Sequence, residues 1–456
     1  MYRILPENLI RFAKLCPAPL YVVGGSVRDF LCGYLHGKAS GADWDICSPS
    51  EEDLIISCAE QCGFSVCAVY KQTGTVKLRD NAGENYEFTR FRSDKYVRGI
   101  HTPVEITFTD KIEQDAVRRD FCANAVYYDI KARTFVDPLG GIADIKERTL
   151  RTVAPAQKVF GEDGLRLMRL ARIAAQIGFT PDENCLEGAR FHARLILDIA
   201  PERIFSELTQ LLHADEKHGF ADAPYRGLRL LRESGVLNFI LPELALGDGM
   251  AQRADFHKYD VLEHSFRCVR YASASVRLAA LLHDVGKPFC FCRDGNFHAH
   301  AEEGARIAQD VLARLKAPKK LALDVGTLIL LHMKDYDLKM RERKIKKIIL
   351  QNEKLFPKLL ALKQADYTAC KDDPSPAPCV VKWETLYRNM KLAHIPLSLG
   401  ELAVGGRDLL ETGIAPQNVG TLLDTLLREC ALDGLKNEKA VLIRRAEKLN
   451  EKKETP

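Results

Sequence analysis

The sequence predicts an α+β protein, in which a head of mixed strands and helices precedes a long helical body. Up to about residue 150, short β-rich runs such as 86–91 and 104–108 alternate with turn signals such as 81–83. From about residue 157, apolar residues recur at the spacing that puts them on one face of a helix. A proline-rich break at 373–378 cannot continue a helix and indicates a linker or an exposed loop.

The composition is that of an ordinary globular protein of about three domains. Of its 456 residues, 46% are hydrophobic and 28% are charged, which excludes disordered, collagenous and low-complexity chains. No apolar stretch approaches the roughly 20 residues that a membrane-spanning helix needs, and no signal peptide is evident. We therefore expect a cytoplasmic protein without a membrane partner; the sequence leaves its oligomeric state open.

The cysteine spacing and the distribution of charge add two expectations. None of the fourteen cysteines forms a C-x-x-C pair, the spacing that structural zinc sites use, so we expect reduced cysteines that fill apolar space. The net charge is only +4, but six basic residues and one acid occupy 339–347 (KMRERKIKK). Such a cluster fits either a solvated helix face or a nucleic-acid surface.

The first candidate site begins at a glycine turn between a predicted strand and a predicted helix. Gly24 and Gly25 let the backbone approach a ligand, a helix N-terminus favours phosphate, and Arg28 follows one turn later. Alone, such a turn is more often purely structural. Asp43 and Asp45 strengthen the interpretation, because residues two apart on a strand point the same way and two carboxylates repel unless a cation lies between them. Mg²⁺ is the expected cation, since it prefers oxygen ligands.

With its neighbouring motifs, this arrangement resembles the nucleotidyltransferase superfamily of DNA polymerase β, and within it the tRNA CCA-adding and bacterial poly(A) polymerase branch. Each motif is weak alone, but the six occur in the family's order between about residues 20 and 210. They are GGSVRD (24–29), DWD (43–45), YEFTRFR (86–92), RRDFCANA (118–125), EDGLRLMRLAR (162–172) and PERIFSEL (201–208). The resemblance implies a polymerase-β-like catalytic head.

The resemblance also implies roles for individual residues. Asp43 and Asp45 would be the metal ligands and Glu87 the third carboxylate, so that two metal ions activate the primer 3′-hydroxyl and neutralise the leaving pyrophosphate. Glu87 could instead be an exposed strand acid. The implied nucleotide-binding residues are Gly24, Gly25, Arg28, Arg119, Asp120, Asp163, Arg166, Arg169 and Arg172. Among them, Asp120 would accept a hydrogen bond from the ribose 2′-hydroxyl, and Arg169 and Arg172 could serve RNA phosphates instead.

Asp163 and Arg166 allow a physical argument about which bases are accepted. Three residues apart, they are expected to share one face of a helix. Aspartate offers acceptors and arginine offers donors. Cytosine and adenine each present an amino donor beside a ring-nitrogen acceptor, whereas uracil and guanine present the opposite order, so the pair would accept C and A. An ordinary helix salt bridge is the alternative. Residues 93–103 resemble the family's flexible loop for the switch from C to A, which counts against a CC-only enzyme.

A second set of residues follows the H…HD…D pattern of HD-domain metal phosphohydrolases, which the region around RLAALLHDVGKP (277–288) resembles. Neutral imidazoles and carboxylates bind a transition metal or Mg²⁺. The implied divalent-metal ligands are His264, His283, Asp284 and Asp366, and His300 and His332 match further histidines of metal-dependent HD domains. A helical scaffold that merely binds tRNA is the alternative. His257 follows no such pattern and is expected to be structural.

These resemblances divide the chain into four predicted parts. They are a nucleotidyltransferase head (1–150), a helical neck that reads the base and binds RNA (151–255), an HD domain (256–372) and a helical tail that contacts tRNA (373–456). We predict template-independent addition of CCA to tRNA 3′ ends from CTP and ATP, with pyrophosphate released and with HD phosphohydrolase activity as an additional option. The alternatives are an A-adding enzyme or poly(A) polymerase of the same family and, in another class, an HD phosphohydrolase with an RNA-binding head.

Overall fold

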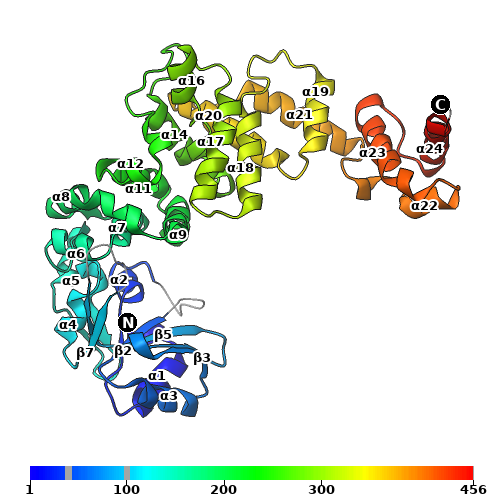
Figure 1. Cartoon of the computed structure of the whole chain (residues 1–456). Coiled ribbons are helices and arrows are strands. Elements are labelled where there is room, and N and C mark those ends of the chain that lie inside the picture. Colours follow the sequence, from blue (N-terminus) through cyan, green and yellow to red (C-terminus); the bar gives the residue numbers. More distant parts are fainter. Residues whose placement is uncertain (36–43, 97–102, 455–456) are drawn as a thin grey trace. The chain divides into compact units, whose positions relative to one another are not determined.

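A computed structural model gives the structure of the chain and describes residues 1–35, 44–96 and 103–454 (Figure 1). The chain divides into two compact units, Met1–Ala245 and Leu246–Pro456. The first unit combines a mixed sheet with helices, and the described residues of the second unit form helices without strands. The predicted α+β class is therefore confirmed, whereas the finer division into four parts stays a prediction.

A seven-stranded sheet forms the centre of the head, with the strand order β3-β4-β5-β2-β1-β8-β9. The central pair β2 and β5 is parallel and its other neighbouring pairs are antiparallel. Side chains of β5 alternate, with Tyr86 and Phe88 buried and Glu87 exposed, as expected when one face of a strand packs on a core. The strands are β1 (Tyr21–Val22), β2 (Trp44–Ser48), β3 (Ser65–Tyr70), β4 (Thr75–Arg79), β5 (Asn85–Arg90), β8 (Tyr127–Asp129) and β9 (Thr134–Val136).

Short helices and two small sheets complete the head. The helix α3 packs against β3 and β4, and α2 packs against β2 and α5. The antiparallel pair is β6 (Arg92–Lys95) with β7 (Glu105–Phe108), and the parallel pair is β10 (Thr149–Leu150) with β11 (Thr180–Pro181). The helices are α1 (Glu7–Leu15), α2 (Gly25–Leu31), α3 (Glu52–Gln61), α4 (Ile112–Val117) and α5 (Gly141–Glu147).

The rest of the first unit is helical, as the periodicity after residue 157 predicts. Its central helix α7 is buried on nearly all sides and packs against α9 and α11, which explains why its apolar residues are not confined to one stripe. The helices are α6 (Ala156–Glu162), α7 (Leu165–Ile177), α8 (Glu183–His192), α9 (Pro201–Leu212), α10 (Asp215–His218), α11 (Ala223–Glu233), α12 (Leu237–Ile240) and α13 (Pro242–Ala245).

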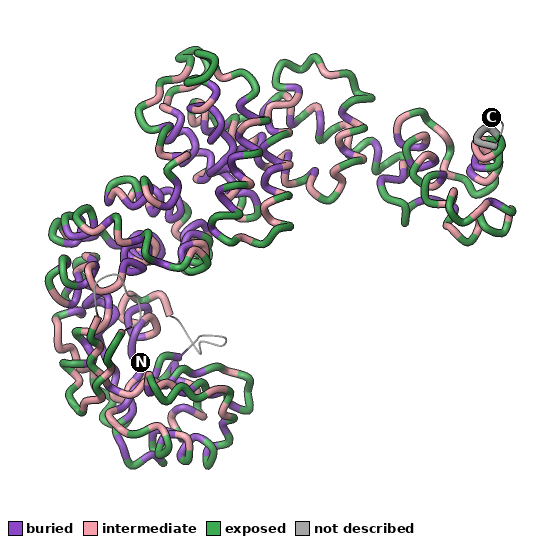
Figure 2. The backbone as a smooth tube through the Cα atoms, in the orientation of Figure 1, coloured by how far each residue is buried: buried purple, intermediate pink, exposed green. Residues whose placement is uncertain are grey.

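In the second unit, buried residues concentrate in the helices from α14 to α20 (Figure 2). A separate apolar core, which includes Leu409, Leu426 and Leu442, joins the last three helices. The predicted proline break lies between α20 and α21, where Pro378 is the first residue of α21. The helices are α14 (Val261–Tyr271), α15 (Arg277–Leu282), α16 (Lys287–Asp294), α17 (His300–Arg314), α18 (Lys319–His332), α19 (Glu342–Gln351), α20 (Phe356–Lys371), α21 (Pro378–Leu392), α22 (Gly406–Glu411), α23 (Pro416–Asp433) and α24 (Lys439–Glu454).

Two expectations from composition can be compared with the structure. All fourteen cysteines are free and nine of them are buried, in agreement with their predicted use as apolar fillers. Among the helices of the described residues, none combines the length and the apolar character needed to cross a bilayer.

Candidate functional site

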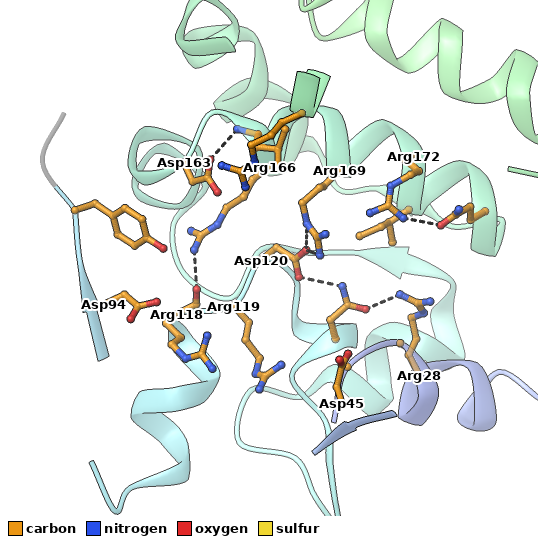
Figure 3. Close-up of a pocket in the computed structure, with 18 of the residues that line it drawn as sticks. Arg28, Asp45, Asp94, Arg118, Arg119, Asp120, Asp163, Arg166, Arg169 and Arg172 are labelled. Atoms are coloured by element: carbon orange, nitrogen blue, oxygen red, sulfur yellow. Dashed lines mark hydrogen bonds and ion pairs between the residues drawn. The ribbon is translucent and has the colours of Figure 1, made fainter. Parts of the chain in front are cut away.

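A cavity of about 420 Å³ lies in the first unit and brings together most of the residues predicted for the first site (Figure 3). Its described lining contains eight arginines and one lysine against four aspartates, and such an excess of positive charge favours an anionic ligand. Ten of the twelve predicted residues line it, namely Gly24, Gly25, Arg28, Asp45, Arg119, Asp120, Asp163, Arg166, Arg169 and Arg172.

The predicted carboxylates are placed by the two central strands. Asp45 on β2 and Glu87 on β5 are direct partners in the parallel register, so their side chains lie on the same face of the sheet. Both residues are exposed. The described cavity lining includes Asp45 but not Glu87, whose Oε2 lies 3.9 Å from Nζ of Lys77 on the neighbouring strand β4. Two exposed carboxylates on one face suit a hard divalent cation. Asp43, the other predicted metal ligand, lies outside the described residues.

The backbone at Gly24 lies close to the carboxylate of Asp45. Its φ of +79° belongs to the left-handed region that side chains rarely adopt, and a Cβ added there would lie 2.8 Å from Asp45 Oδ2. Any other residue would be strained and would also press on this carboxylate. The glycine at this position is therefore required both by backbone conformation and by the close approach of the two segments.

A chain of hydrogen bonds connects the glycine turn to α7. Arg28 Nη1 donates to Asn124 Oδ1 at 2.6 Å, and Asn124 Nδ2 donates to Asp120 Oδ1 at 2.9 Å. Arg169 then donates to Asp120 Oδ2 through Nε at 2.9 Å and Nη2 at 2.6 Å. The chain thus runs from the head into the helical neck without leaving the cavity wall (Figure 3).

Asp120 is the central acceptor of this chain, and its charge is balanced within the protein. Burial favours the neutral acid, but Arg169 and Asn124 outweigh it and hold the pKa of Asp120 well below its usual range. Oδ1 also accepts from the backbone N–H of Phe121 at 2.8 Å. Both oxygens of Asp120 therefore have protein donors, and its predicted contact with a ribose 2′-hydroxyl stays a prediction.

Asp163 and Arg166 both line the cavity, but the expectation that they share one helix face is wrong. Asp163 has extended backbone between α6 and α7, and its Oδ1 accepts from the backbone N–H of Leu165 at 2.9 Å. A short acid that binds the first free N–H groups of a helix is stable in front of that helix rather than inside it. Arg166 is in α7 and donates to Glu162 Oε2 at 3.2 Å and to the carbonyl of Arg118 at 2.6 Å.

Several lining residues were not predicted individually. Arg92, Arg118 and Asn124 lie inside the quoted motifs, so the motifs could have indicated them. Arg203 lies in the last motif, on α9. Others lie outside every motif: Asp94, Tyr96, Gln176 and Lys217. Tyr96 lies under the guanidinium of Arg166, with 5.7 Å between the Arg166 Cζ and the ring centroid.

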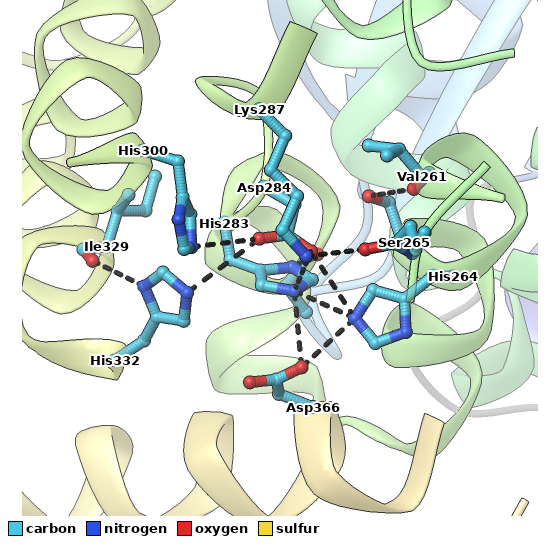
Figure 4. Close-up of polar contacts among 12 residues, drawn as sticks. Val261, His264, Ser265, His283, Asp284, Lys287, His300, Ile329, His332 and Asp366 are labelled. Atoms are coloured by element: carbon cyan, nitrogen blue, oxygen red, sulfur yellow. Dashed lines mark hydrogen bonds and ion pairs between the residues drawn. The ribbon is translucent and has the colours of Figure 1, made fainter. Parts of the chain in front are cut away.

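The second predicted set converges in the second unit (Figure 4). His264 Nε2 lies 3.0 Å from Asp366 Oδ1, His283 Nε2 lies 3.2 Å from Asp284 Oδ2, and His300 Nε2 lies 3.4 Å from Asp284 Oδ1. These residues come from five helices or their ends, since α14, α15, α17, α18 and α20 each contribute to the cluster. The H…HD…D pattern therefore forms one group together with His300 and His332, and all its members are buried except the partly exposed Asp366.

Three of these imidazoles have the orientation of metal ligands. His283, His300 and His332 each place Nδ1 2.8, 2.7 and 2.6 Å from a backbone carbonyl, and so turn Nε2 towards the cluster. The Nε2 atoms of His300 and His332 are buried without a hydrogen-bond partner. Burial and the nearby His283 lower the pKa of His332 to about 3, which keeps its imidazole neutral, as a metal ligand must be. For His283 itself, Asp284 and Asp366 outweigh burial and raise the pKa to about 10, so a metal would have to displace its proton. The donor set fits a divalent metal.

Lys287 is a neighbour of this cluster that the pattern alone does not assign. Its Nζ donates to Asp284 Oδ2 at 2.6 Å and to Gln252 Oε1 at 2.7 Å. Asp284 therefore offers one oxygen to Lys287 and the other to His300 and His332 (Figure 4). The histidine His257, expected to be structural, stacks edge-on against His264 with 4.9 Å between the ring centroids.

Three family models match successive segments of the chain. The model of the poly A polymerase head domain matches residues 20–151, and the model of the probable RNA and SrmB-binding site of polymerase A matches 178–246. The HD domain model matches 261–369. The first cavity therefore draws on the first two matches and on residues 163–176 between them, and the histidine cluster lies within the third.

Similar proteins cover most of the chain. The A-adding tRNA nucleotidyltransferase of Deinococcus radiodurans is 30% identical over 79% of this chain and 78% of its own length. The multifunctional CCA protein of Stenotrophomonas maltophilia (strain K279a) is 34% identical over 66% of this chain and 72% of its own. The CCA-adding enzyme of Geobacillus stearothermophilus is 29% identical over 92% and 90%. Among solved structures, the Bacillus stearothermophilus CCA-adding enzyme in complex with CTP superposes with a TM-score of 0.67 at 25% identity and covers 99% of both chains.

Proposed function

The chain belongs to the tRNA nucleotidyltransferase family with an HD domain, and from this premise we propose that it adds CCA to tRNA 3′ ends, using CTP and ATP and releasing pyrophosphate. The observation that carries the proposal is the cavity, in which an exposed carboxylate of the sheet faces a wall of arginines. Relatives named for CCA addition cover up to 92% of the chain. As cytoplasmic partners we propose tRNA and the two nucleotides.

The carboxylate corner would carry the chemistry of the reaction. Asp45, with Glu87 on the adjacent strand and Asp43 beyond the described residues, would hold Mg²⁺. Bound there, the ion supplies Lewis-acid activation of the primer hydroxyl and neutralises charge on the leaving pyrophosphate. The protein's own part is to position the triphosphate: the turn at Gly24 and Gly25 approaches it closely, and Arg28 supplies positive charge in a fixed orientation.

Arg166 retains donors for reading a base. A guanidinium carries five N–H donors, and the contacts of Arg166 to the Val159 carbonyl, Glu162 and the Arg118 carbonyl use three of them. One N–H on Nε and one on Nη2 remain, and these can donate to an acceptor such as a ring nitrogen. Asp163 supplies the acceptor for an exocyclic amino group. Arg166 forms its ion pair with Glu162 rather than with Asp163, so Asp163 and Arg166 can both contact a C or A base.

The test of the proposal is nucleotide addition to a tRNA that ends at the discriminator base, resolved at single-nucleotide length. CTP alone should extend it by two residues, and CTP with ATP should stop at three. Addition of A only to tRNA that already ends in CC, or an unbounded A ladder, would instead identify an A-adding enzyme or a poly(A) polymerase of the same family. The first of these is a real competitor, because an A-adding relative is 30% identical.

A second activity is supported by the histidine cluster, and we propose a divalent-metal phosphohydrolase site there. Its support is the pair of buried Nε2 atoms on His300 and His332, which have no hydrogen-bond partner and lie next to Asp284. Metal content by mass spectrometry, and hydrolysis of a bis(p-nitrophenyl) phosphate probe, should both be lost in His332→Ala. Addition of CCA should continue in that variant, which would separate the two sites.

A further inference from the structure

Lys217 is the one lysine in the described lining of the cavity, and no sequence motif contains it. It lies on α10, in the helical neck, yet it reaches the glycine turn of the head. Its Nζ is 2.9 Å from Asp29 Oδ2, and its side chain is 46% exposed to solvent. A half-exposed ammonium at the cavity wall is available to a ligand in a way that a buried cation is not.

Asp29 has more cationic neighbours than its charge requires. Arg28 donates to Asp29 Oδ1 through Nε at 2.8 Å and Nη2 at 2.6 Å, and Lys217 Nζ lies 2.9 Å from Oδ2. One arginine held by two hydrogen bonds balances one carboxylate. The charge of Lys217 is therefore in excess at Asp29, and its two remaining N–H groups can face the cavity.

The glycine turn defines two ends of the space beside it. A Cβ at Gly24 would lie 2.8 Å from Asp45 Oδ2, whereas a Cβ at Gly25 would lie 3.5 Å from Arg28 Nη2 and 3.9 Å from Lys217 Nζ. The phosphate that reacts must lie near the carboxylates that hold the metal, hence at the Gly24 end. A triphosphate that follows the turn then places its outer phosphates at the Gly25 end, beside Arg28 and Lys217.

Of these two cations, Lys217 is the one that can move. Arg28 is 3% exposed and is held by Asp29 and Asn124, so turning it would break buried hydrogen bonds. We propose that Lys217 binds the β- and γ-phosphates of the incoming CTP or ATP. This role rests on the proposed function and deepens it, because a neck residue inside the segment that matches an RNA-binding model would recognise the nucleotide.

The proposal is tested with the full-length chain and the variant Lys217→Met. The KM values for CTP and ATP should rise by the same factor, on the order of tenfold, because the two nucleotides share only the triphosphate and ribose and one charge-assisted hydrogen bond is lost. The inhibition constant of pyrophosphate, a probe that carries phosphates alone, should rise by that factor too. The KM for tRNA should not change. Lys217→Arg should restore most of the affinity, and Lys146→Met, at an exposed lysine of α5 outside the cavity lining, is the matched control.

Two results would overturn the role of Lys217. One is an unchanged pyrophosphate inhibition constant with a raised KM for tRNA, which would assign the lysine to RNA. The other is equal damage in Lys217→Arg together with a lowered melting temperature, which would mean that the lysine only supports Asp29. If the wild-type chain adds no nucleotide to tRNA, the proposed function fails instead, and direct calorimetric binding of pyrophosphate to wild type and Lys217→Met then decides the role of Lys217 separately.

Discussion

The cavity of the first unit and the histidine cluster of the second unit solve opposite electrostatic problems. In the cavity wall, the buried Asp120 and the adjacent buried Asp29 already have cationic partners, and the surplus charge of the lining is positive. In the cluster, carboxylates and imidazoles meet, while the buried nitrogens His264 Nδ1, His300 Nε2 and His332 Nε2 lack hydrogen-bond partners. The carboxylates of the first site are already paired with protein cations, so its excess positive charge favours an anionic ligand. The second site has unpaired buried nitrogens beside carboxylates, so a cation would satisfy its groups. Both are predicted metal sites, but only the second needs the metal for its own buried groups.

The largest effect should follow from removing the carboxylate at the cavity's catalytic end. In Asp45→Asn, nucleotide addition should fall on the order of a thousandfold, equivalent to about 4 kcal/mol of transition-state stabilisation, because a metal ligand becomes a neutral amide. Single-turnover extension of tRNA measures this directly. Hydrolysis of the phosphodiester probe by the histidine cluster serves as the control and should keep its wild-type rate; parallel loss of both activities would mean that the two sites are not independent.

A large loss of stability should follow from unbalancing Asp120. Arg169→Met leaves this buried carboxylate without its cation, which costs about 3 kcal/mol in the free energy of unfolding. Urea unfolding of the variant measures the loss. The double variant Asp120→Asn with Arg169→Met should recover part of it, since no unpaired charge remains buried. If the double variant were the less stable of the two, the balanced-charge description of the cavity would be wrong.

Removing metal should sharpen the contrast between the units. If the metal is present at a hundred times its dissociation constant, chelation should lower the free energy of unfolding of the unit that contains the histidine cluster by about 2.7 kcal/mol. Thermal unfolding with and without chelator measures the shift. His332→Ala should be insensitive to chelator, and an equal shift in wild type and variant would show that the stabilising metal binds elsewhere.

A smaller effect, on pH dependence, concerns Asp115 behind the cavity. Burial raises its pKa, but Arg119 and Arg118 outweigh burial and lower it from 3.8 to about 2. Because the folded pKa is depressed, the stability from Asp115 is fully present above about pH 4 and is lost as the pH falls towards 2, a change of roughly 2 kcal/mol. Unfolding of wild type and Asp115→Asn at pH 6 and pH 3 should show the gap between them narrowing at the lower pH. A gap of constant size would contradict the pairing.

The sequence predicted the carboxylates of the first site where the information was local. The motifs located Asp45 and its neighbour Glu87, and strand pairing then placed the two side by side. It could not place contacts set by packing between distant segments: Arg166 donates to the carbonyl of Arg118, 48 residues away, and Lys217 reaches Asp29 from another helix. The hydrogen bond from the Leu165 N–H to Asp163 was not predicted, because three-residue spacing by itself indicates one continuous helix.

The cluster was predicted more completely, for a physical reason. His283 and Asp284 are adjacent, and metal chemistry restricts which residue types can join them, so the pattern survives long gaps in sequence. His264 and Asp366 are 102 residues apart in the sequence and lie in contact because α14 packs on α20. What remained hidden was orientation: which ring nitrogen faces inward depends on the carbonyls at Phe297 and Ile329, and no side-chain pattern encodes these.

The hydrogen-bond chain from Arg28 through Asn124 and Asp120 to Arg169 limits how this chain can be recombined. A hybrid that takes its head from one relative and its neck from another, joined near residue 150, would split the chain between Asp120 and Arg169. Such a hybrid would inherit a matched contact only if both parents carry the acid and the arginine at these places. Head and neck are thus a single unit of exchange, and because Lys217 on α10 also contacts Asp29 of the head, a successful graft has its seam beyond α10 rather than at the boundary between sheet and helices.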